Sequence, residues 1–144
     1  DMRKILVLSL LLLPVPLHAS GDPPEQAVAQ FLDAFRAMEP ARFDSFFAPD
    51  ATVFFPDGRF PTNRLLPRAE ALAAFHGFFE SLKVQGLTRL QIDPVDLRIE
   101  RFGDVAVVTF LLKGAESMGR RTMVFTKAEG GWRIVHLYAS RSAP

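Results

Sequence analysis

The chain has 144 residues, with 17 basic and 16 acidic side chains, 49% hydrophobic residues and no cysteine. Its length fits one domain with one hydrophobic core. The formal charge of +1 and the scattered arginines argue against a nucleic-acid-binding protein, which needs a concentrated basic surface. The lack of cysteine excludes a disulfide framework and a cysteine-linked lipid anchor.

The first twenty residues have the order of parts of a secretory signal peptide. Arg3 and Lys4 precede an apolar run over residues 5–13, and small residues follow it. That run is shorter than the ~20 residues of a membrane-spanning helix. We therefore predict a signal peptide in residues 1–20, cleaved after Ala19, and one periplasmic or secreted domain over residues 21–144 that does not contact the membrane after cleavage. An uncleaved leader docked on an apolar groove is the alternative.

Three helices are expected at the start of this domain. The helical spacing of apolar residues and the prolines at the start predict a helix over residues 22–38. Pro40 begins a second, short helix that Pro49 ends. Apolar residues recurring every three or four positions predict a third helix from residue 68 to just before Gly86.

The rest of the chain has the period of strands. Residues 51–55 are β-branched and aromatic and predict a first strand, and residues 59–67 predict a loop at the sheet edge. Turn residues then separate five β-rich stretches, over residues 87–92, 95–99, 105–112, 118–127 and 132–140. A hairpin turn is predicted at residues 129–131. Three helices followed by an antiparallel sheet predict an α+β fold, with the helices on one face of a curved sheet.

Polar pocket candidates lie on the last two strands. Strict alternation along the final strand places Trp132, His136 and Tyr138 on one face. A histidine beside a tyrosine could bind a carboxylate or carbonyl, or act as an acid/base pair. In the alternative interpretation, His136 is a core or interface histidine. Arg121 would favour an anionic ligand if it faced the same pocket, and otherwise lies at a solvated strand edge.

Phenylalanine dominates the aromatic residues, with fourteen against one tryptophan and one tyrosine. Phe31, Phe35 and Phe55 are therefore candidates to line a pocket for an apolar or aromatic ligand, although such spacing also fits a plain core. With three histidines, one of them in the leader, a histidine-rich metal site is not expected. No glycine-rich phosphate loop or nucleophile elbow is present in the sequence. We expect neither a metal nor a cofactor.

Three segments carry a family resemblance. They are Phe-Phe-Ala-Pro-Asp-Ala-Thr-Val at 46–53, Phe-His-Gly-Phe-Phe-Glu at 75–80 and Gly-Gly-Trp-Arg-Ile-Val-His-Leu-Tyr-Ala-Ser at 130–140. In these segments the chain resembles the nuclear transport factor two-like superfamily, in particular SnoaL-like domains and the association domain of calcium/calmodulin-dependent kinase type II. The resemblance implies a cone-shaped α+β fold in which a strongly curved, mostly antiparallel sheet encloses a pocket. It also implies a homodimer formed through the outer sheet face.

The resemblance leaves the function open. It places the general base of a ketosteroid isomerase at Phe55 and the oxyanion-hole tyrosine at Phe31, where neither ring can transfer a proton. Whether the protein is an enzyme is therefore uncertain. Our first hypothesis is an exported module that binds a small hydrophobic or carboxylate ligand. The alternatives are a SnoaL-like isomerase, dehydratase or cyclase that acts on a hydrophobic carbonyl compound through His136 or Tyr138, and an oligomeric assembly module.

Overall fold

The computed structural model describes residues 22–56, 63–114 and 117–142. The helices are α1 (Pro24–Ala37), α2 (Pro40–Asp44) and α3 (Arg68–Val84), and the strands are β1 (Phe47–Phe54), β2 (Leu66–Pro67), β3 (Pro94–Phe102), β4 (Val105–Lys113), β5 (Met118–Ala128) and β6 (Gly131–Ser142). The predicted leader lies outside the described residues. Within the described ranges, no helix is long and apolar enough to cross a membrane.

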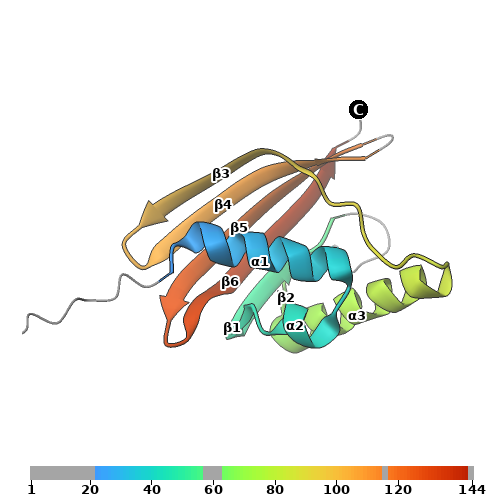
Figure 1. The fold of residues 1–144 in the computed structure, drawn as a ribbon, viewed down its shortest axis with the longest axis horizontal. Coiled ribbons are helices and arrows are strands. Elements are labelled where there is room, and N and C mark those ends of the chain that lie inside the picture. The colour runs from blue at the N-terminus through green and yellow to red at the C-terminus, as the bar shows by residue number, and fades with distance from the viewer. Residues whose placement is uncertain (1–21, 57–62, 115–116, 143–144) are drawn as a thin grey trace, which may run out of the picture.

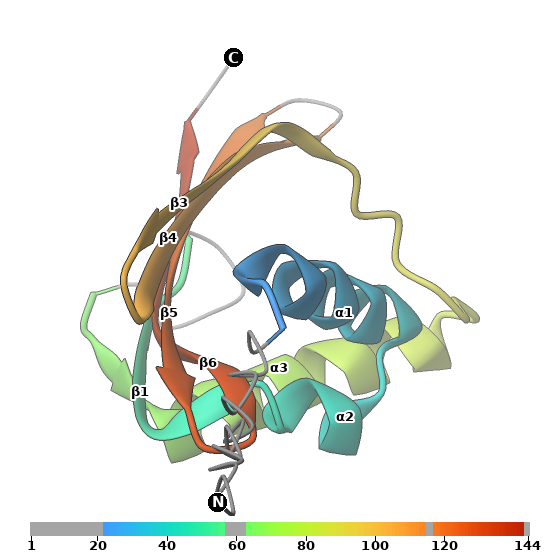
Figure 2. The same cartoon turned by 60° about the vertical axis from the view of Figure 1, so that its left-hand side comes forward.

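The strands form one curved sheet in the order β2-β1-β6-β5-β4-β3. The pairing of β1 with β6 is parallel, and the other pairings are antiparallel. Helix α1 lies on the concave side of the sheet, and α2 and α3 lie at its β1 end (Figures 1 and 2). The predicted α+β fold, with three helices on a strongly curved and mostly antiparallel sheet, is confirmed.

The hairpin between β5 and β6 is also confirmed. Ala128 pairs with Gly131, so that two residues form the turn between them. Gly130 and Gly131 have φ angles of 87° and 118°, which only glycine adopts readily. This glycine pair therefore fixes where β6 begins and hence the register of the strand that carries most of the candidate polar residues.

The predicted strand over residues 87–92 is wrong. The backbone N–H of Leu90 donates to the carbonyl of Arg36 on α1 at 2.8 Å, and Arg36 Nε donates to the carbonyl of Ile92 at 2.9 Å. Because these groups bond to a helix, the segment crosses the end of α1 instead of joining the sheet. The composition of residues 87–92 fits a strand, but the segment bonds to Arg36 of α1 instead of to a neighbouring strand.

The start of the sheet also differs from the prediction. Strand β1 begins at Phe47, four residues before the predicted start, and α2 ends correspondingly early. The predicted edge loop contributes the two residues of β2, which pair with Thr52 and Val53 of β1. The remainder of that loop, residues 57–62, lies outside the described residues.

The core is centred on Phe43 of α2, whose side chain is 0% exposed. Its ring centroid lies between 4.8 and 5.4 Å from five other rings, those of Phe31, Phe35, Phe47, Phe75 and Phe79. The pairs are tilted or edge-to-face, and such pairs stabilise by about 0.5 to 1.5 kcal/mol beyond the buried area. This one ring joins α1, α3 and β1.

Replacing Phe43 with alanine should therefore lower the free energy of unfolding by about 3 to 5 kcal/mol, because the change leaves a cavity among well-packed rings. Urea unfolding followed by circular dichroism measures this. The control is Phe102→Ala at the edge of the sheet, where the side chain is 62% exposed and the cost should stay within about 0.5 kcal/mol. Similar losses in the two variants would contradict the placement of Phe43 at the centre of the core.

Candidate functional site

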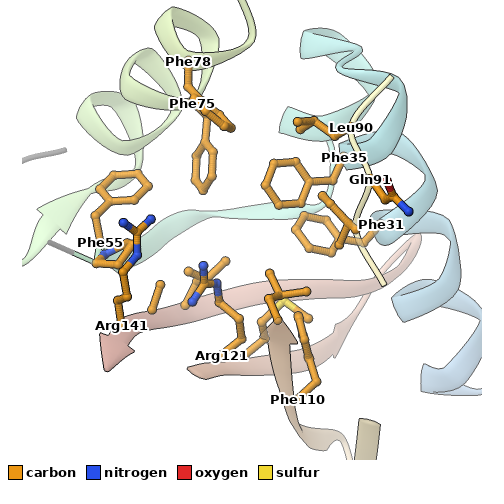
Figure 3. A pocket seen from close by; sticks show the side chains of 16 residues that line it. Phe31, Phe35, Phe55, Phe75, Phe78, Leu90, Gln91, Phe110, Arg121 and Arg141 are labelled. Carbon is orange, nitrogen blue, oxygen red and sulfur yellow. The ribbon is translucent and has the colours of Figure 1, made fainter. Parts of the chain in front are cut away.

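A cavity of about 430 Å³ lies between the concave face of the sheet, α1, α3 and the segment over residues 90–92. Its volume is within the range of about 300 to 1,000 Å³ that is typical of small-molecule sites. Figure 3 shows rings from α1 and α3 facing arginines from β5 and β6 across this space. The cavity is the part of the cone that the phenylalanine core does not fill.

The cavity wall is mostly apolar. Six phenylalanines line it, from both helices, the end of β1 and the sheet: Phe31, Phe35, Phe55, Phe75, Phe78 and Phe110. Aliphatic and methionine side chains complete the apolar part, at Pro56, Leu90, Ile92, Leu112, Met123, Leu137 and Ala139. The polar lining residues are Gln91, Arg121 and Arg141. Within the described residues, the lining thus offers one amide and two guanidinium groups.

Arg121 faces the cavity from β5, where strict alternation also turns Met123 and Phe125 inward. Its Nη1 donates to the carbonyl of Arg120 at 2.9 Å and to that of Ser140 at 3.2 Å. Gly119 gives this side chain its room, because a Cβ at that position would lie 2.9 Å from Nη1 of Arg121. Backbone carbonyls of β5 and β6 therefore hold the guanidinium against the sheet, in the space that the missing side chain of Gly119 leaves.

Arg141 of β6 is close to Arg121 on the same face. It pairs directly with Gly119, two residues from Arg121 along β5, and such diagonal neighbours are about 7 to 8 Å apart. Burial lowers the pKa of the Arg121 guanidinium from its ordinary value, and the positive charge of Arg141 acts in the same direction. Across the described part of the chain, neither arginine forms an ion pair with a carboxylate, whereas Arg42, Arg64 and Arg98 do.

The placement of His136 and Tyr138 on the pocket face is wrong, because β6 contains a bulge. Val124 of β5 pairs with His136 and Phe125 pairs with Ile134, so that Val135 has no partner on β5. One extra residue reverses the alternation that follows it. Leu137, Ala139 and Arg141 consequently line the cavity.

His136 and Tyr138 therefore lie on the outer face of the sheet. His136 Nδ1 is hydrogen-bonded to Thr52 Oγ1 of β1 at 2.8 Å, and Tyr138 is 44% exposed, with its ring 6.1 Å from that of Phe54. His136 is thus half-buried and bonded to a side chain, which does not fit a core histidine, and its place in an interface stays a prediction. An acid/base pair on this face has no access to the cavity.

Trp132 precedes the bulge and does point inward, but it lies away from the large cavity. Its Nε1 donates to the carbonyl of Asp22 at 2.9 Å, and Arg101 stacks 5.3 Å from its ring centroid. It lines a small pocket of about 80 Å³ beside the start of α1. Trp132 thus anchors the beginning of α1 to the hairpin between β5 and β6.

The structure brings four of the seven predicted pocket residues together: Phe31, Phe35, Phe55 and Arg121 all line the cavity. Their role in binding stays a prediction. Sequence reasoning missed Arg141, which strict alternation had placed on the opposite face from the pocket. The apolar residues Leu137 and Ala139 could have indicated its position. If the apolar face of β6 continues from Ile134 to these two residues, the inward-facing positions must change from even to odd residue numbers after Ile134, which places Arg141 on the inner face.

The lining as described contains no group suited to proton transfer near neutral pH. Its side chains include no carboxylate, imidazole, hydroxyl or amine, and general acid/base catalysis requires such a group within hydrogen-bond reach of the substrate. Phe55 and Phe31 occupy the cavity wall, where the resemblance places a catalytic base and a tyrosine. Among the described residues, no three histidine, cysteine or acidic side chains are grouped in a way that could hold a metal ion.

A family model for SnoaL-like domains matches residues 25–144. The fold is similar to that of a candidate dehydratase of the NTF2-like family from Streptomyces avermitilis, at 19% identity over 84% of this chain and 94% of that one, with a TM-score of 0.67. A candidate calcium/calmodulin-dependent protein kinase type II association domain from Thiobacillus denitrificans has 25% identity over 85% and 97% of the two chains and a TM-score of 0.61. A candidate ketosteroid isomerase from Parabacteroides distasonis has 18% identity over 85% and 90%, with a TM-score of 0.60. A search of curated proteins gives no match.

Deleting Val135 tests the bulge. The deletion removes the unpaired residue, so that alternation from Ile134 through His136 still places Leu137 and Ala139 on the cavity face, and it should lower the free energy of unfolding by no more than about 1 kcal/mol. The matched control is the deletion of Val107 in the regular strand β4, which turns buried Ala106 or Val108 out of the core and should cost more than about 3 kcal/mol. Urea unfolding compares the two. If the two deletions are equally costly, Val135 is not the extra residue that sets which side chains face the cavity.

Proposed function

The chain belongs to the SnoaL-like domain family, within the NTF2-like superfamily, and on this basis we propose that it binds a small, largely hydrophobic molecule in the cone cavity. The observation that carries the proposal is the wall itself: six phenyl rings around about 430 Å³, with three polar residues among the described lining. Burying apolar surface of a ligand gains roughly 25 cal/mol per Å², so such a wall can supply most of the binding free energy without a strong polar contact.

Rigidity of the wall supports the proposal. Phe75 packs edge-to-face on Phe55 at 4.9 Å and on Phe35 at 5.8 Å between centroids, and Phe31 and Phe35 both pack on the buried ring of Phe43. Rings held from behind in this way keep the cavity open and preformed. A preformed site reduces the entropy that binding must otherwise lose in ordering side chains.

Binding is favoured over conversion by the chemistry of the described lining. An isomerase, dehydratase or cyclase of this family would need a group that moves a proton at the substrate. The two residues first considered for that role, His136 and Tyr138, face the other side of the sheet. The lining residues Phe31 and Phe55 can give the cavity its shape and exclude water from a bound ligand. Both effects favour binding and require no proton transfer.

The proposal includes export, which rests on the leader sequence. Residues 1–20 have the charge, apolar run and small-residue exit of a signal peptide. N-terminal sequencing of the protein recovered from the periplasm or medium of an expressing bacterium should therefore give Ser20 as the first residue. Recovery of the full-length chain from the cytoplasm alone would contradict export and leave the binding proposal unaffected.

N-phenyl-1-naphthylamine, an uncharged probe that fluoresces in apolar surroundings, tests the cavity. We expect saturable binding that weakens about tenfold or more in Ala139→Trp, because the new indole fills the site. The matched control is Thr122→Trp on the neighbouring strand, at a position paired with Tyr138 on the outer face, where affinity should change less than about twofold.

Two safeguards keep this test decisive. Thermal unfolding shows whether each variant is folded, and Leu112→Trp fills the same cavity from a half-buried position on β4, where a larger side chain is easier to accommodate. An unaffected affinity in a folded cavity-filling variant, or no binding by the wild type, would contradict the proposal.

A further inference from the structure

Two arginines stand in the wall of an otherwise apolar cavity without a counter-charge. Arg121 is half-buried and Arg141 is its diagonal neighbour, and no carboxylate in the described ranges pairs with either. Two like charges on diagonal cross-strand positions repel each other, and removing a charge from water costs free energy unless a partner replaces the water. Arg121 carries both costs in the cavity wall.

The position of Arg121 is supported by its neighbours. Two backbone carbonyls accept hydrogen bonds from Nη1, which restrains the guanidinium in the cavity wall, and among the described residues no hydrogen bond is formed by Nε or Nη2. Gly119 leaves space for the group, and its φ is not in the left-handed region. The glycine is therefore explained by the room that Arg121 needs rather than by backbone conformation.

From this pair we infer that the cavity ligand carries an oxyanion group at one end, held between Arg121 and Arg141, with its apolar body among the rings of α1 and α3. The inference rests on the proposed function and adds the class and orientation of the ligand. Guanidinium groups bind planar or tetrahedral oxyanions through paired N–H groups. A carboxylate, sulfonate or phosphate shares the chemistry that these two side chains recognise.

The geometry orders the ligand along the cone. Arg121 and Arg141 project from the β5–β6 side of the cavity, opposite Phe31 and Phe35 of α1 (Figure 3). Gln91 lies with Leu90 on the connecting segment, on the helix side of the same space. An anionic head therefore points toward β5 and β6, and an aromatic or aliphatic body extends toward α1 and α3.

The decisive comparison uses two probes that differ in one group. N-phenyl-1-naphthylamine and 8-anilinonaphthalene-1-sulfonate share an aromatic frame, and the second adds a sulfonate. We expect the sulfonate probe to bind the wild-type protein about tenfold tighter or more, since each charge-assisted hydrogen bond strengthens binding. Without the arginines, the added charge should weaken entry into an apolar cavity.

Arg121→Gln and Arg141→Gln test the assignment. Each should reduce the affinity for the sulfonate probe about tenfold while the affinity for the neutral probe changes less than about twofold. The matched control is Arg120→Gln, which removes the same charge from the exposed neighbour on the other face of β5 and should leave both affinities unchanged. Arg141 is exposed, so its substitution keeps the test informative if the Arg121 variant fails to fold.

Gly119→Ala tests the positioning of Arg121. The added methyl group would displace the guanidinium, so the sulfonate preference should fall while binding of the neutral probe is retained. If the neutral probe binds and the sulfonate probe binds no tighter in the wild type, or if Arg120→Gln lowers sulfonate affinity as much as Arg121→Gln, the anion site is refuted and the proposed function stands. Failure of the neutral probe to bind refutes the proposed function itself.

Discussion

A curved sheet cannot pack along its whole concave face against straight helices, and this geometric constraint governs the rest of the structure. Strand twist and the β6 bulge bend the sheet, while α1 remains straight on its concave side (Figure 2). At the β1 end the gap is filled by rings packed around Phe43. Further along the cone the rings of Phe31, Phe35 and Phe75 meet space rather than another layer, and the cavity results.

The same phenylalanines therefore have two tasks. Their inner edges complete the core, as the buried position of Phe31 at 2% exposure shows, and their remaining surface forms the cavity wall. This explains why the sequence could be interpreted either as plain core or as pocket. The core interpretation describes the side of each ring that packs on other rings, and the pocket interpretation describes the side that faces the cavity.

Much of the fold could be predicted from the sequence because its signals are local. Helical periodicity located α3, and the glycine pair at residues 130 and 131 located the last hairpin. The segment over residues 87–92 could not be placed in this way, since its hydrogen bonds go to Arg36, far away in the sequence. Local β propensity carries no information about such a partner.

The candidate site was predictable in its apolar part and at Arg121, where alternation along β5 is regular. The prediction was wrong on β6, because one unpaired residue, Val135, exchanges the two faces of the strand. His136 and Tyr138 were favoured as chemically versatile groups and lie on the outer face, whereas Arg141 was passed over and lines the cavity. The bulge therefore removes the two residues on which the enzymatic alternative depended and adds a second arginine to the site of the binding hypothesis.

The central claim is that the cavity binds an amphipathic anion in one orientation, and a crystal structure with 8-anilinonaphthalene-1-sulfonate tests it most directly. Anomalous scattering from the sulfonate sulfur gives the position of the charged end independently of the aromatic frame. The account predicts the sulfonate between Arg121 and Arg141 and the naphthyl and phenyl rings against Phe31, Phe35 and Phe75. A sulfonate directed away from both arginines, or a probe seated only on the outer face beside Tyr138, would contradict it.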